Sequence, residues 1–414
     1  MLSTPLEDLE ERHSPSPRSG RSRSARWSRA RVHRRRRRIL GVVAAAFGVF
    51  FLWLAISLGG ALTNPALGSS MGARAAEWFR GHGGASIVVW AETQWYSHHQ
   101  PKVGGSLAAG TIRKPTATPT TTPTIATVTH LPTPSPLTPF ASPAVAGEGQ
   151  WSPIGRTVSG IPAVYETMLR PDAIHTSYVV GVAWMDTKLL KATLYSGSAI
   201  PGGGPYSHTA PISSSDATSL VAAFNAGFLM SDANGGYYTD GKTIVPLRTG
   251  AASFVVYKNG SATVGQWGRD VSMGSDIASV RQNLNLLVDN GQVVPAASTV
   301  SSRQWGATLG GGLYVWRSGL GVTANGALVY VGGPGLDILD LANILVRAGA
   351  VRGMEMDINT DWVNFSSYQP SSPTGAATPA NGTELVPGMT GTPGRYFEPW
   401  WARDFITMSA ATGS

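Results

Sequence analysis

The sequence contains no cysteine in its 414 residues. Thiol catalysis, zinc sites built on cysteine and disulfide cross-links are therefore excluded. A domain exported from the cytoplasm with this composition has to be stabilised by its hydrophobic core. The C-terminal part of the chain is long enough to bury such a core, so the absence of disulfides is compatible with export.

The folded part of the chain also lacks net charge. Residues 1–38 hold 12 arginines and 4 acidic residues, which accounts for the whole formal charge of +8. Residues 39–414 hold 20 basic and 20 acidic residues. A basic globular surface is therefore missing, and we expect no nucleic-acid partner. A nucleic-acid-binding Arg/Ser tail is the alternative, although membrane topology and anionic lipids already explain a basic run beside an apolar segment.

Charge is missing altogether from the 24 residues Ile39–Leu62, which follow five consecutive arginines, Arg34–Arg38. A helix of this length spans about 36 Å, enough to cross a hydrocarbon core of about 30 Å. Basic residues stay on the cytoplasmic side, which predicts a cytoplasmic N-terminus and an extracellular C-terminal part. A cleaved signal peptide is the alternative, but its charged and apolar regions are shorter than these. We therefore predict a single-pass signal anchor in the cell membrane that contacts the lipid bilayer through residues 39–62.

Composition divides the chain into five segments. These are a disordered basic cytoplasmic tail (1–38), a transmembrane helix (39–62), a juxtamembrane segment (63–110), a Thr/Pro-rich linker (111–149) and a folded domain (150–414). Prolines keep the linker extended, so we expect a disordered spacer that lifts the domain off the membrane. In the juxtamembrane segment, Met71–Arg80 has helical character and Ile87–Tyr96 is apolar and aromatic.

The folded domain has a mostly β pattern. β-branched and aromatic runs between Gly, Asn and Asp turns predict strands at 177–184, 189–196, 253–258, 313–316, 327–331 and 362–365. Apolar residues at helical spacing predict one helix over 336–348, with Gly349 as its C-terminal cap and a strand after it. We expect an α+β fold, a mostly β mixed sheet with few helices.

Two common catalytic signatures are missing or out of context. The chain has no GxSxG elbow, and its histidines lack metal-ligand spacing. Residues 236–243 (GYYTDGKT) fit the phosphate-loop pattern, but an extended, Pro-interrupted stretch follows where that loop needs a helix. Asp240-Gly241 predicts a hairpin turn instead.

Acidic side chains gather in the segment 354–362 (MEMDINTDW). Alternation along a strand places Glu355 and Asp357 on one face and the two methionines on the other, toward the core and the helix over 336–348. Buried carboxylates without partners are costly, so the acidic face requires water, a cation or a substrate.

Asp357, Asn359 and Asp361 form a D-x-N-x-D pattern that is similar to half of a calcium loop. Trp362 stands where that loop needs glycine, which excludes an EF-hand. No cofactor is required, and a looser site for a divalent cation such as calcium near Asp357 stays open. Carboxylates at a strand end suit acid/base chemistry on a glycosidic or phosphodiester bond, and the alternative is an acidic loop held by hydrogen bonds.

Two further segments carry polar groups within or at the end of apolar elements. The run Ala222–Phe228 contains Asn225 and Gly227, which indicate either a substrate-facing amide or a turn. Arg317 stands in an apolar strand, where its guanidinium needs a carboxylate or a ligand phosphate unless it reaches solvent.

In this order, the segments resemble the phosphodiester glycosidase domain family, which includes the enzyme that uncovers mannose 6-phosphate by removing N-acetylglucosamine. Phe224–Phe228 (FNAGF) is similar to the Asn-Gly-Gly-Phe-Phe-like segment of the family, and Arg317–Gly321 (RSGLG) to its Arg-Thr-Ala-Ile-Gly-like strand. A helix and a strand ending at Asp357 occupy the place of the family's helix and strand before Asp-Gly-Gly. The resemblance covers about residues 175–368. Residues 358–360 (INT) replace the family's glycines, which implies a changed pocket.

The resemblance implies a membrane-tethered extracytoplasmic hydrolase of sugar-1-phosphodiester bonds, with envelope glycopolymers as candidate substrates. Asp357 is then the acid/base residue, Arg317 holds the phosphate, and Glu355 is a further catalytic candidate. The substrate-binding candidates are Asn225, Gly227, Asn359, Asp361 and Trp362. The competing hypothesis is a non-catalytic glycan-binding or envelope-structure module that keeps the fold without the activity.

Overall fold

The computed structural model describes residues 22–113, 128–298, 304–306, 312–391 and 393–411. The chain divides into two compact units, Met1–Gly60 and Ala61–Ser414. The first contains most of one long helix, and the second contains three β-sheets and the remaining helices.

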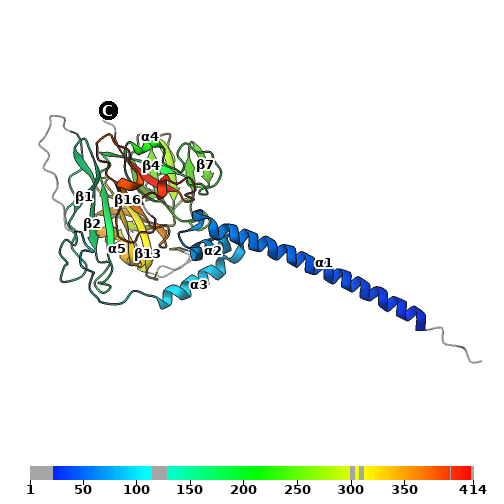
Figure 1. Ribbon diagram of the computed structural model, residues 1–414. Coiled ribbons are helices and arrows are strands. Elements are labelled where there is room, and N and C mark those ends of the chain that lie inside the picture. The colour runs from blue at the N-terminus through cyan, green and yellow to red at the C-terminus, as the bar shows by residue number, and fades with distance from the viewer. Residues whose placement is uncertain (1–21, 114–127, 299–303, 307–311, 392, 412–414) are drawn as a thin grey trace, which may run out of the picture. The chain divides into compact units, whose positions relative to one another are not determined.

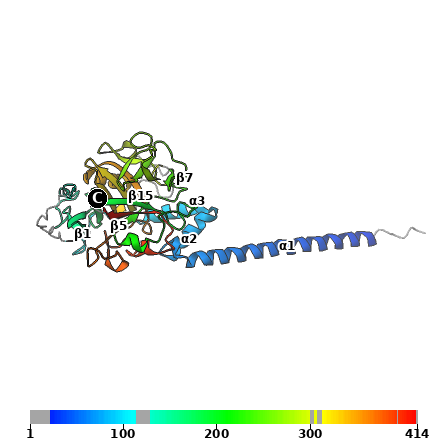
Figure 2. The same ribbon diagram turned by 90° about the horizontal axis from the view of Figure 1, so that it is seen from above.

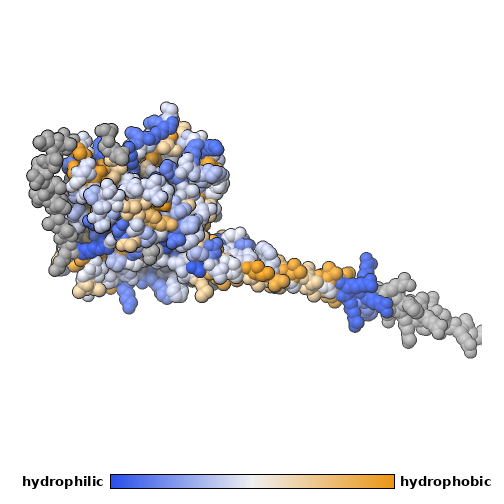
Figure 3. Space-filling view, turned by 45° about the horizontal axis from the view of Figure 1, so that its top comes forward, coloured by the Kyte–Doolittle hydropathy of each residue, from blue (hydrophilic) through white to orange (hydrophobic). Residues whose placement is uncertain are grey.

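Helix α1 (Ser22–Thr63) contains the long apolar run. Its part His33–Thr63 is long and apolar enough to cross a membrane, a property shared by signal anchors and signal peptides. Apolar side chains cover this stretch, and hydrophilic ones gather toward its N-terminal end (Figure 3). The helix begins at Ser22 and not at Ile39, so the prediction of disorder is wrong for residues 22–38. Arginine is a good helix former, and a helix extends more easily than it nucleates.

The remainder of the predicted disordered tail, residues 1–21, lies outside the described residues.

Two helices follow η1 (Pro65–Leu67) and lie against the β-rich body of the second unit (Figures 1 and 2). The prediction of a helix at 71–80 is confirmed by α2 (Met71–Phe79), and the apolar run at 87–96 lies in α3 (Ala85–His98). The turn between them, η2 (Arg80–Gly84), is kinked where Gly83 adopts a φ of 84°. We refer to residues 71–98 as the α2–α3 segment.

The body of the second unit consists of three sheets whose named strands pair antiparallel throughout the described residues, so the prediction of a mixed sheet is wrong in this respect. The eight-stranded sheet has the order β1 (Ser152–Val158), β2 (Ile161–Leu169), β3 (Val180–Met185), β14 (Leu328–Leu336), β13 (Val315–Thr323), β15 (Ala350–Ile358), β11 (Leu286–Asp289) and β12 (Gln292–Val293). One five-stranded sheet has the order β7 (Lys242–Val245), β6 (Tyr237–Thr239), β10 (Ile277–Gln282), β8 (Ala252–Tyr257) and β9 (Ala262–Gln266). The other has the order β17 (Gly382–Glu384), β16 (Phe365–Tyr368), β5 (Leu220–Asn225), β18 (Phe405–Ala410) and β4 (Leu190–Tyr195). Short helices are α4 (Ser214–Ala217), η3 (Pro295–Ser298), η4 (Pro379–Asn381) and η5 (Arg395–Phe397), and α5 (Ile338–Arg347) is the longest helix of the body.

Local sequence patterns located many of these elements correctly. The runs at 177–184, 189–196, 253–258, 313–316 and 327–331 fall on β3, β4, β8, β13 and β14, and the strand after the helix is β15. The run at 362–365 is mostly a turn, because β16 begins only at Phe365. The phosphate-loop-like motif is the β6–β7 hairpin, in which Asp240 and Gly241 have φ values of 50° and 72°, as a two-residue hairpin turn requires.

Helix α5 packs on the apolar face of the eight-stranded sheet and comes very close to β13 at Gly319. Its N-cap Asp337 accepts a hydrogen bond from the Asp340 amide at 2.7 Å. A Cβ built on Gly319 of β13 would lie 3.1 Å from Leu341 Cδ1 and from Leu345 Cδ1. Glycine in the RSGLG segment is therefore explained by the close approach of the helix.

The opposite face of the sheet carries the methionines. Met354 and Met356 are fully buried in a core cluster that includes Leu320, whereas the apolar residues of α5 belong to another cluster. The expected packing of these methionines against the helix is therefore wrong. The cluster also includes Phe224 of β5 and Phe254 of β8, so this face joins the eight-stranded sheet to the other two.

Part of the predicted spacer packs on the domain. Residues 114–127 lie outside the described residues, whereas 128–149 are described and contain no helix or strand. Leu131 and Leu137 are buried in the same cluster as α5. This half of the Thr/Pro-rich segment therefore covers the core, and its prolines suit an extended covering chain because they lack amide donors that need partners.

The contact between α5 and β13 can be tested with Gly319→Ala. The added Cβ also meets Met354 O at 3.1 Å, a backbone atom that cannot move freely, so we expect a loss of about 1–3 kcal/mol in the free energy of unfolding. Urea unfolding of the full chain in detergent measures this loss. Gly81→Ala is the control, since a Cβ there meets no atom within 4 Å. Equal effects of the two substitutions would contradict the packing account.

Candidate active site

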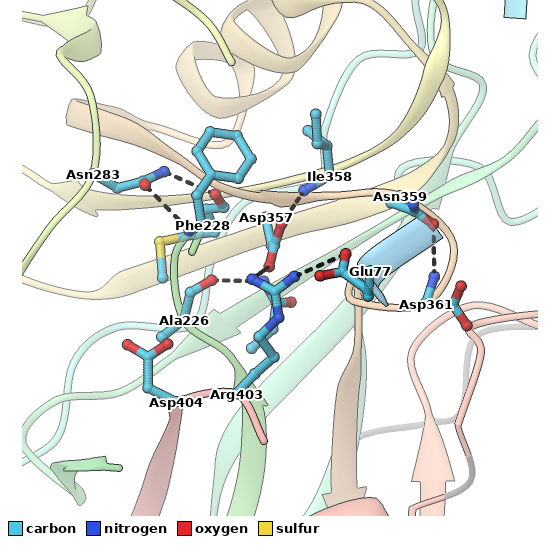
Figure 4. A network of polar contacts seen from close by, with 12 residues as sticks. Glu77, Ala226, Phe228, Asn283, Asp357, Ile358, Asn359, Asp361, Arg403 and Asp404 are labelled. Carbon is cyan, nitrogen blue, oxygen red and sulfur yellow. Dashed lines mark hydrogen bonds and ion pairs between the residues drawn. The ribbon is translucent and has the colours of Figure 1, made fainter. Parts of the chain in front are cut away.

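A cavity lies where Asp357, at the end of β15, comes close to residues before β18 and after β5. Its lining from the β-rich body is Phe228, Leu229, Asp232, Gly306, Asp357, Ile358, Asn359, Trp362 and Arg403. The α2–α3 segment supplies the rest, Glu77, Arg80 and Glu92. Three of the predicted site residues, Asp357, Asn359 and Trp362, are thus brought together at one cavity. Figure 4 shows Asp357 and Asn359 on the same stretch of chain.

A β-bulge orients Asp357. Arg317 pairs with Ile358 and Gly319 pairs with Glu355, so one residue of β13, Ser318, faces two residues of β15. The Ser318 hydroxyl accepts a hydrogen bond from the Asp357 amide at 3.1 Å and donates to the Asp357 carbonyl at 2.8 Å. Bulges of this kind redirect a side chain. The serine therefore fixes the backbone from which the Asp357 carboxyl reaches the cavity.

The Asp357 carboxyl is almost completely buried, with 4% of the residue exposed. Burial raises its pKa from 3.8 to about 7, although the nearby Arg403 guanidinium opposes this shift. One carboxyl oxygen accepts from the Ile358 amide at 2.8 Å, and the other lies 3.8 Å from Arg403 Nη1. Asp357 therefore exchanges its proton near neutral pH, as a general acid or base must.

Arg403 brings a cation to the same place. Its guanidinium carbon lies 4.2 Å from the centroid of the Trp362 ring, which holds the group flat against an aromatic face. Its Nη1 atom is buried and has no hydrogen-bond partner among the described residues. The carboxylates within ion-pair distance, Asp357 and Glu77, each lie 3.8 Å away. A buried guanidinium with unfilled donor capacity is suited to bind a phosphate or carboxylate.

The neighbouring Asp404 forms a fully buried ion pair with Arg281 of β10, with 2.6 Å between Arg281 Nε and Asp404 Oδ2. Arg281 also donates to the carbonyls of Phe228 and Gln282. The Asp404 carbonyl accepts from the Ala226 amide at 3.2 Å. The pair thereby holds the segment after β5 and the start of β18 at the end of β10.

Asn225 lies behind the cavity in a saturated hydrogen-bond network. Its amide nitrogen donates to Ser318 Oγ at 3.0 Å, and its amide oxygen accepts from the Tyr330 hydroxyl at 2.8 Å and the Asn364 amide at 3.0 Å. Through Ser318 it supports the Asp357 backbone. Gly227 has no room for a side chain, because a Cβ there would lie 3.0 Å from the Asn283 amide group.

Arg317 and Glu355 form a second fully buried ion pair, with 2.6 Å between Nη1 and Oε1. Of the partners expected for Arg317, the structure shows a carboxylate, and Arg317 also donates to the carbonyls of Leu336 and Leu313. Burial raises the pKa of Glu355 to about 7. Neither residue lines the cavity, although Glu355 precedes Asp357 by two residues on β15.

The turn after Asp357 replaces the family's glycines without losing a glycine-like conformation. Asn359 has a φ of 87°, a left-handed value that asparagine tolerates better than most residues. Its side chain accepts from the Asp361 amide at 3.1 Å. Asp361 accepts two hydrogen bonds from Ser69, and Trp362 is buried, with 5% exposed.

The described residues contain no group of three or more His, Cys, Asp or Glu side chains placed to hold a metal ion. Two carboxylates of this region are paired with arginines, Glu77 with Arg80 and Asp404 with Arg281. A calcium ion near Asp357 stays a prediction.

Sequence reasoning missed Arg403, Asp404, Arg281 and the α2–α3 contribution. A signal was present in Arg403-Asp404, two adjacent charges at the start of an apolar run that forms β18. It could not be assigned to this site, because β18 lies far from β15 in sequence and belongs to another sheet.

Comparison with known proteins agrees with the resemblance. Residues 218–357 match the phosphodiester glycosidase family. The match ends at Asp357 and includes β5, β13 and β15.

No curated protein matches the chain. Among solved structures, the catalytic domain of zebrafish N-acetylglucosamine-1-phosphodiester alpha-N-acetylglucosaminidase, auto-inhibited by its pro-peptide, is 12% identical with a TM-score of 0.40, and 64% of this chain and 88% of that chain are covered. A hypothetical protein from Synechocystis is 13% identical with a TM-score of 0.33, and 63% of this chain and 64% of that chain are covered.

The raised pKa of Asp357 predicts a dependence of stability on pH. The folded state binds a proton up to about pH 7, whereas the unfolded state releases it near 3.8, so stability falls as pH rises between these values and stays low above them. Asn cannot ionise. Relative to wild type, Asp357→Asn should therefore gain roughly 3–10 °C in Tm between pH 4 and pH 8.5. Calorimetry of both proteins checks this, and parallel pH curves would contradict a buried, titrating Asp357.

Proposed function

We propose that the chain is a membrane-tethered hydrolase that cleaves sugar-1-phosphodiester bonds outside the cytoplasm. The observation that carries the proposal is the pairing of a proton-exchanging carboxyl, Asp357, with a buried guanidinium, Arg403, that has unfilled donor capacity. The two groups lie 3.8 Å apart in a domain of the phosphodiester glycosidase family. A phosphodiester needs both a cation for its negative charge and a proton for its leaving oxygen.

In this proposal Arg403 binds the phosphate oxygens. Water attacks the anomeric carbon of the sugar, the bond from that carbon to the bridging oxygen breaks, and its electron pair stays on the phosphate. Asp357 donates its proton to this oxygen and later recovers a proton from the attacking water. The products are a free sugar and a phosphomonoester.

The remaining residues hold this pair in place. Asn225 and Ser318 support the Asp357 backbone, and Trp362 supports the Arg403 guanidinium. We assign the phosphate contact to Arg403 because it lines the cavity, whereas Arg317 is occupied by Glu355 behind it. Envelope glycopolymers, which contain sugar phosphodiesters, are the candidate substrates.

Activity tests the proposal directly. The full chain in detergent is assayed for sugar release from a panel of sugar-1-phosphodiesters, as wild type and as Asp357→Asn. Loss of the acid should lower kcat by about 10²–10⁴-fold. The wild-type rate should fall as pH rises through about 7, because the acid form of Asp357 is lost.

Asp276→Asn, an exposed carboxylate remote from the cavity, is the matched control and should leave the rate unchanged. Glycan binding without turnover of any panel member would favour the non-catalytic module. Turnover that is unchanged in Asp357→Asn would refute the role of this residue.

The tether is tested by labelling single cysteines, which the cysteine-free chain allows without background. With an impermeant maleimide on intact cells, Lys102→Cys should react, whereas Ser3→Cys should react only after permeabilisation. Sequencing of the mature N-terminus should find the apolar helix retained. The opposite labelling pattern, or a chain cleaved after the helix, would contradict a signal anchor.

A further inference from the structure

The cavity beside Asp357 is covered by the α2–α3 segment, which precedes the family domain in sequence. Glu77 of α2 points toward the Arg403 guanidinium (Figure 4), with 3.8 Å between Oε1 and Nη2. The Arg80 guanidinium forms ion pairs with Glu77 at 2.6 Å and with Glu92 of α3 at 2.5 Å. Arg80 therefore links α3 to the Glu77 carboxylate that faces Arg403.

The space that remains is too small for a substrate. About 30 Å³ is left in the cavity, which corresponds to about two water molecules. Sites for small-molecule ligands usually measure about 300–1,000 Å³. A sugar phosphodiester therefore cannot reach Asp357 while the α2–α3 segment occupies this position.

Glu77 occupies the place that a phosphate would take. Its carboxylate and that of Asp357 lie at the same distance from one guanidinium, and Arg403 Nη1 still lacks a hydrogen-bond partner. The Glu77 carboxylate thus balances the charge of Arg403 from a distance but makes no short bidentate hydrogen bonds with it. A phosphate can make such bonds. A phosphodiester has the chemistry to replace the carboxylate.

Contacts near both ends of the segment also anchor it to the β-rich body. Before α2, Ser69 donates to the Asp361 carboxylate from its amide at 2.9 Å and from its hydroxyl. At the end of α3, Tyr96 packs on the apolar cluster that contains Phe228 and Ile358. These contacts hold the segment at both ends, with Glu77 between them over the catalytic pair.

We propose that the α2–α3 segment is a closing element for the candidate active site, with Glu77 as an internal anion that an anionic sugar phosphodiester displaces from Arg403. The inference rests on the proposed function for the identity of that substrate. Only molecules with the α2–α3 segment in the open position can bind substrate. A change that weakens closure increases the fraction of open molecules, and the apparent affinity for substrate rises by the same factor.

Hydrogen exchange of the full chain in nanodiscs tests the closing element without any turnover. Glu77→Gln removes the charge that faces Arg403, and amide exchange across residues 71–98 should accelerate. Asp276→Asn is the control, since Asp276 is exposed and does not line the cavity, and it should leave the exchange of residues 71–98 unchanged. The amides of β5 and β18 should remain protected in both variants, which excludes global unfolding.

Inorganic phosphate at matched ionic strength is the probe for displacement. It should accelerate exchange of residues 71–98 in wild type, and Arg403→Gln should abolish this effect. Where a phosphodiester is turned over, Glu77→Gln should raise kcat/KM by roughly 3–10-fold, as expected for a shift in the open fraction.

Unchanged exchange in Glu77→Gln and no response to phosphate would overturn the closing element, as would equal effects of Glu77→Gln and Asp276→Asn. Acceleration by both treatments supports it even if no phosphodiester is hydrolysed, in which case only the proposed hydrolase fails. Turnover in wild type without any response of residues 71–98 leaves the hydrolase intact and refutes the closing element.

Discussion

The structure depends on how it accommodates charges inside its core. Three arginines meet three carboxylates around the end of β15, as Arg403 with Asp357, Arg281 with Asp404 and Arg317 with Glu355. The last two pairs are fully buried at 2.6 Å, whereas the first is loose at 3.8 Å. Removing one partner of a buried pair is costly, so the Arg317–Glu355 pair fixes β13 beside β15 within the eight-stranded sheet, and the Arg281–Asp404 pair joins β10 to the residues just before β18. The loose pair is the one that faces the cavity and is available for chemistry.

This arrangement explains why the site is assembled from all three sheets. Asp357 belongs to the eight-stranded sheet, Arg281 to one five-stranded sheet, and Asn225 to the other. Ser318 sits at the bulge between β13 and β15 and links the Asp357 backbone to Asn225. The α2–α3 segment adds the charged side chains of Glu77, Arg80 and Glu92 to the cavity. The region before the domain therefore contributes to the electrostatics of the site in addition to connecting the domain to the apolar helix.

Sequence reasoning succeeded where the signal was local. The β6–β7 turn, the helix α5 and Asp357 at a strand end follow from neighbouring residues. It failed where partners are distant. Nothing near Arg403 indicates that it faces Asp357, and nothing near Gly319 indicates that α5 covers it. The packing of the Thr/Pro-rich segment could not be predicted for a similar reason. The burial of Leu131 and Leu137 depends on a core cluster formed by residues far away in the sequence.

Burial keeps the Asp357 carboxyl protonated until near neutral pH, beside the Arg403 guanidinium, which has unfilled donor capacity for an anion. Carboxyl ¹³C NMR of the full chain with ¹³C-labelled aspartate measures this most directly, with Asp357→Asn to assign the resonance. The Asp357 signal should titrate with a midpoint of about 7. A midpoint near the ordinary value of 3.8 would show an ionised carboxylate throughout the physiological range and would contradict the account.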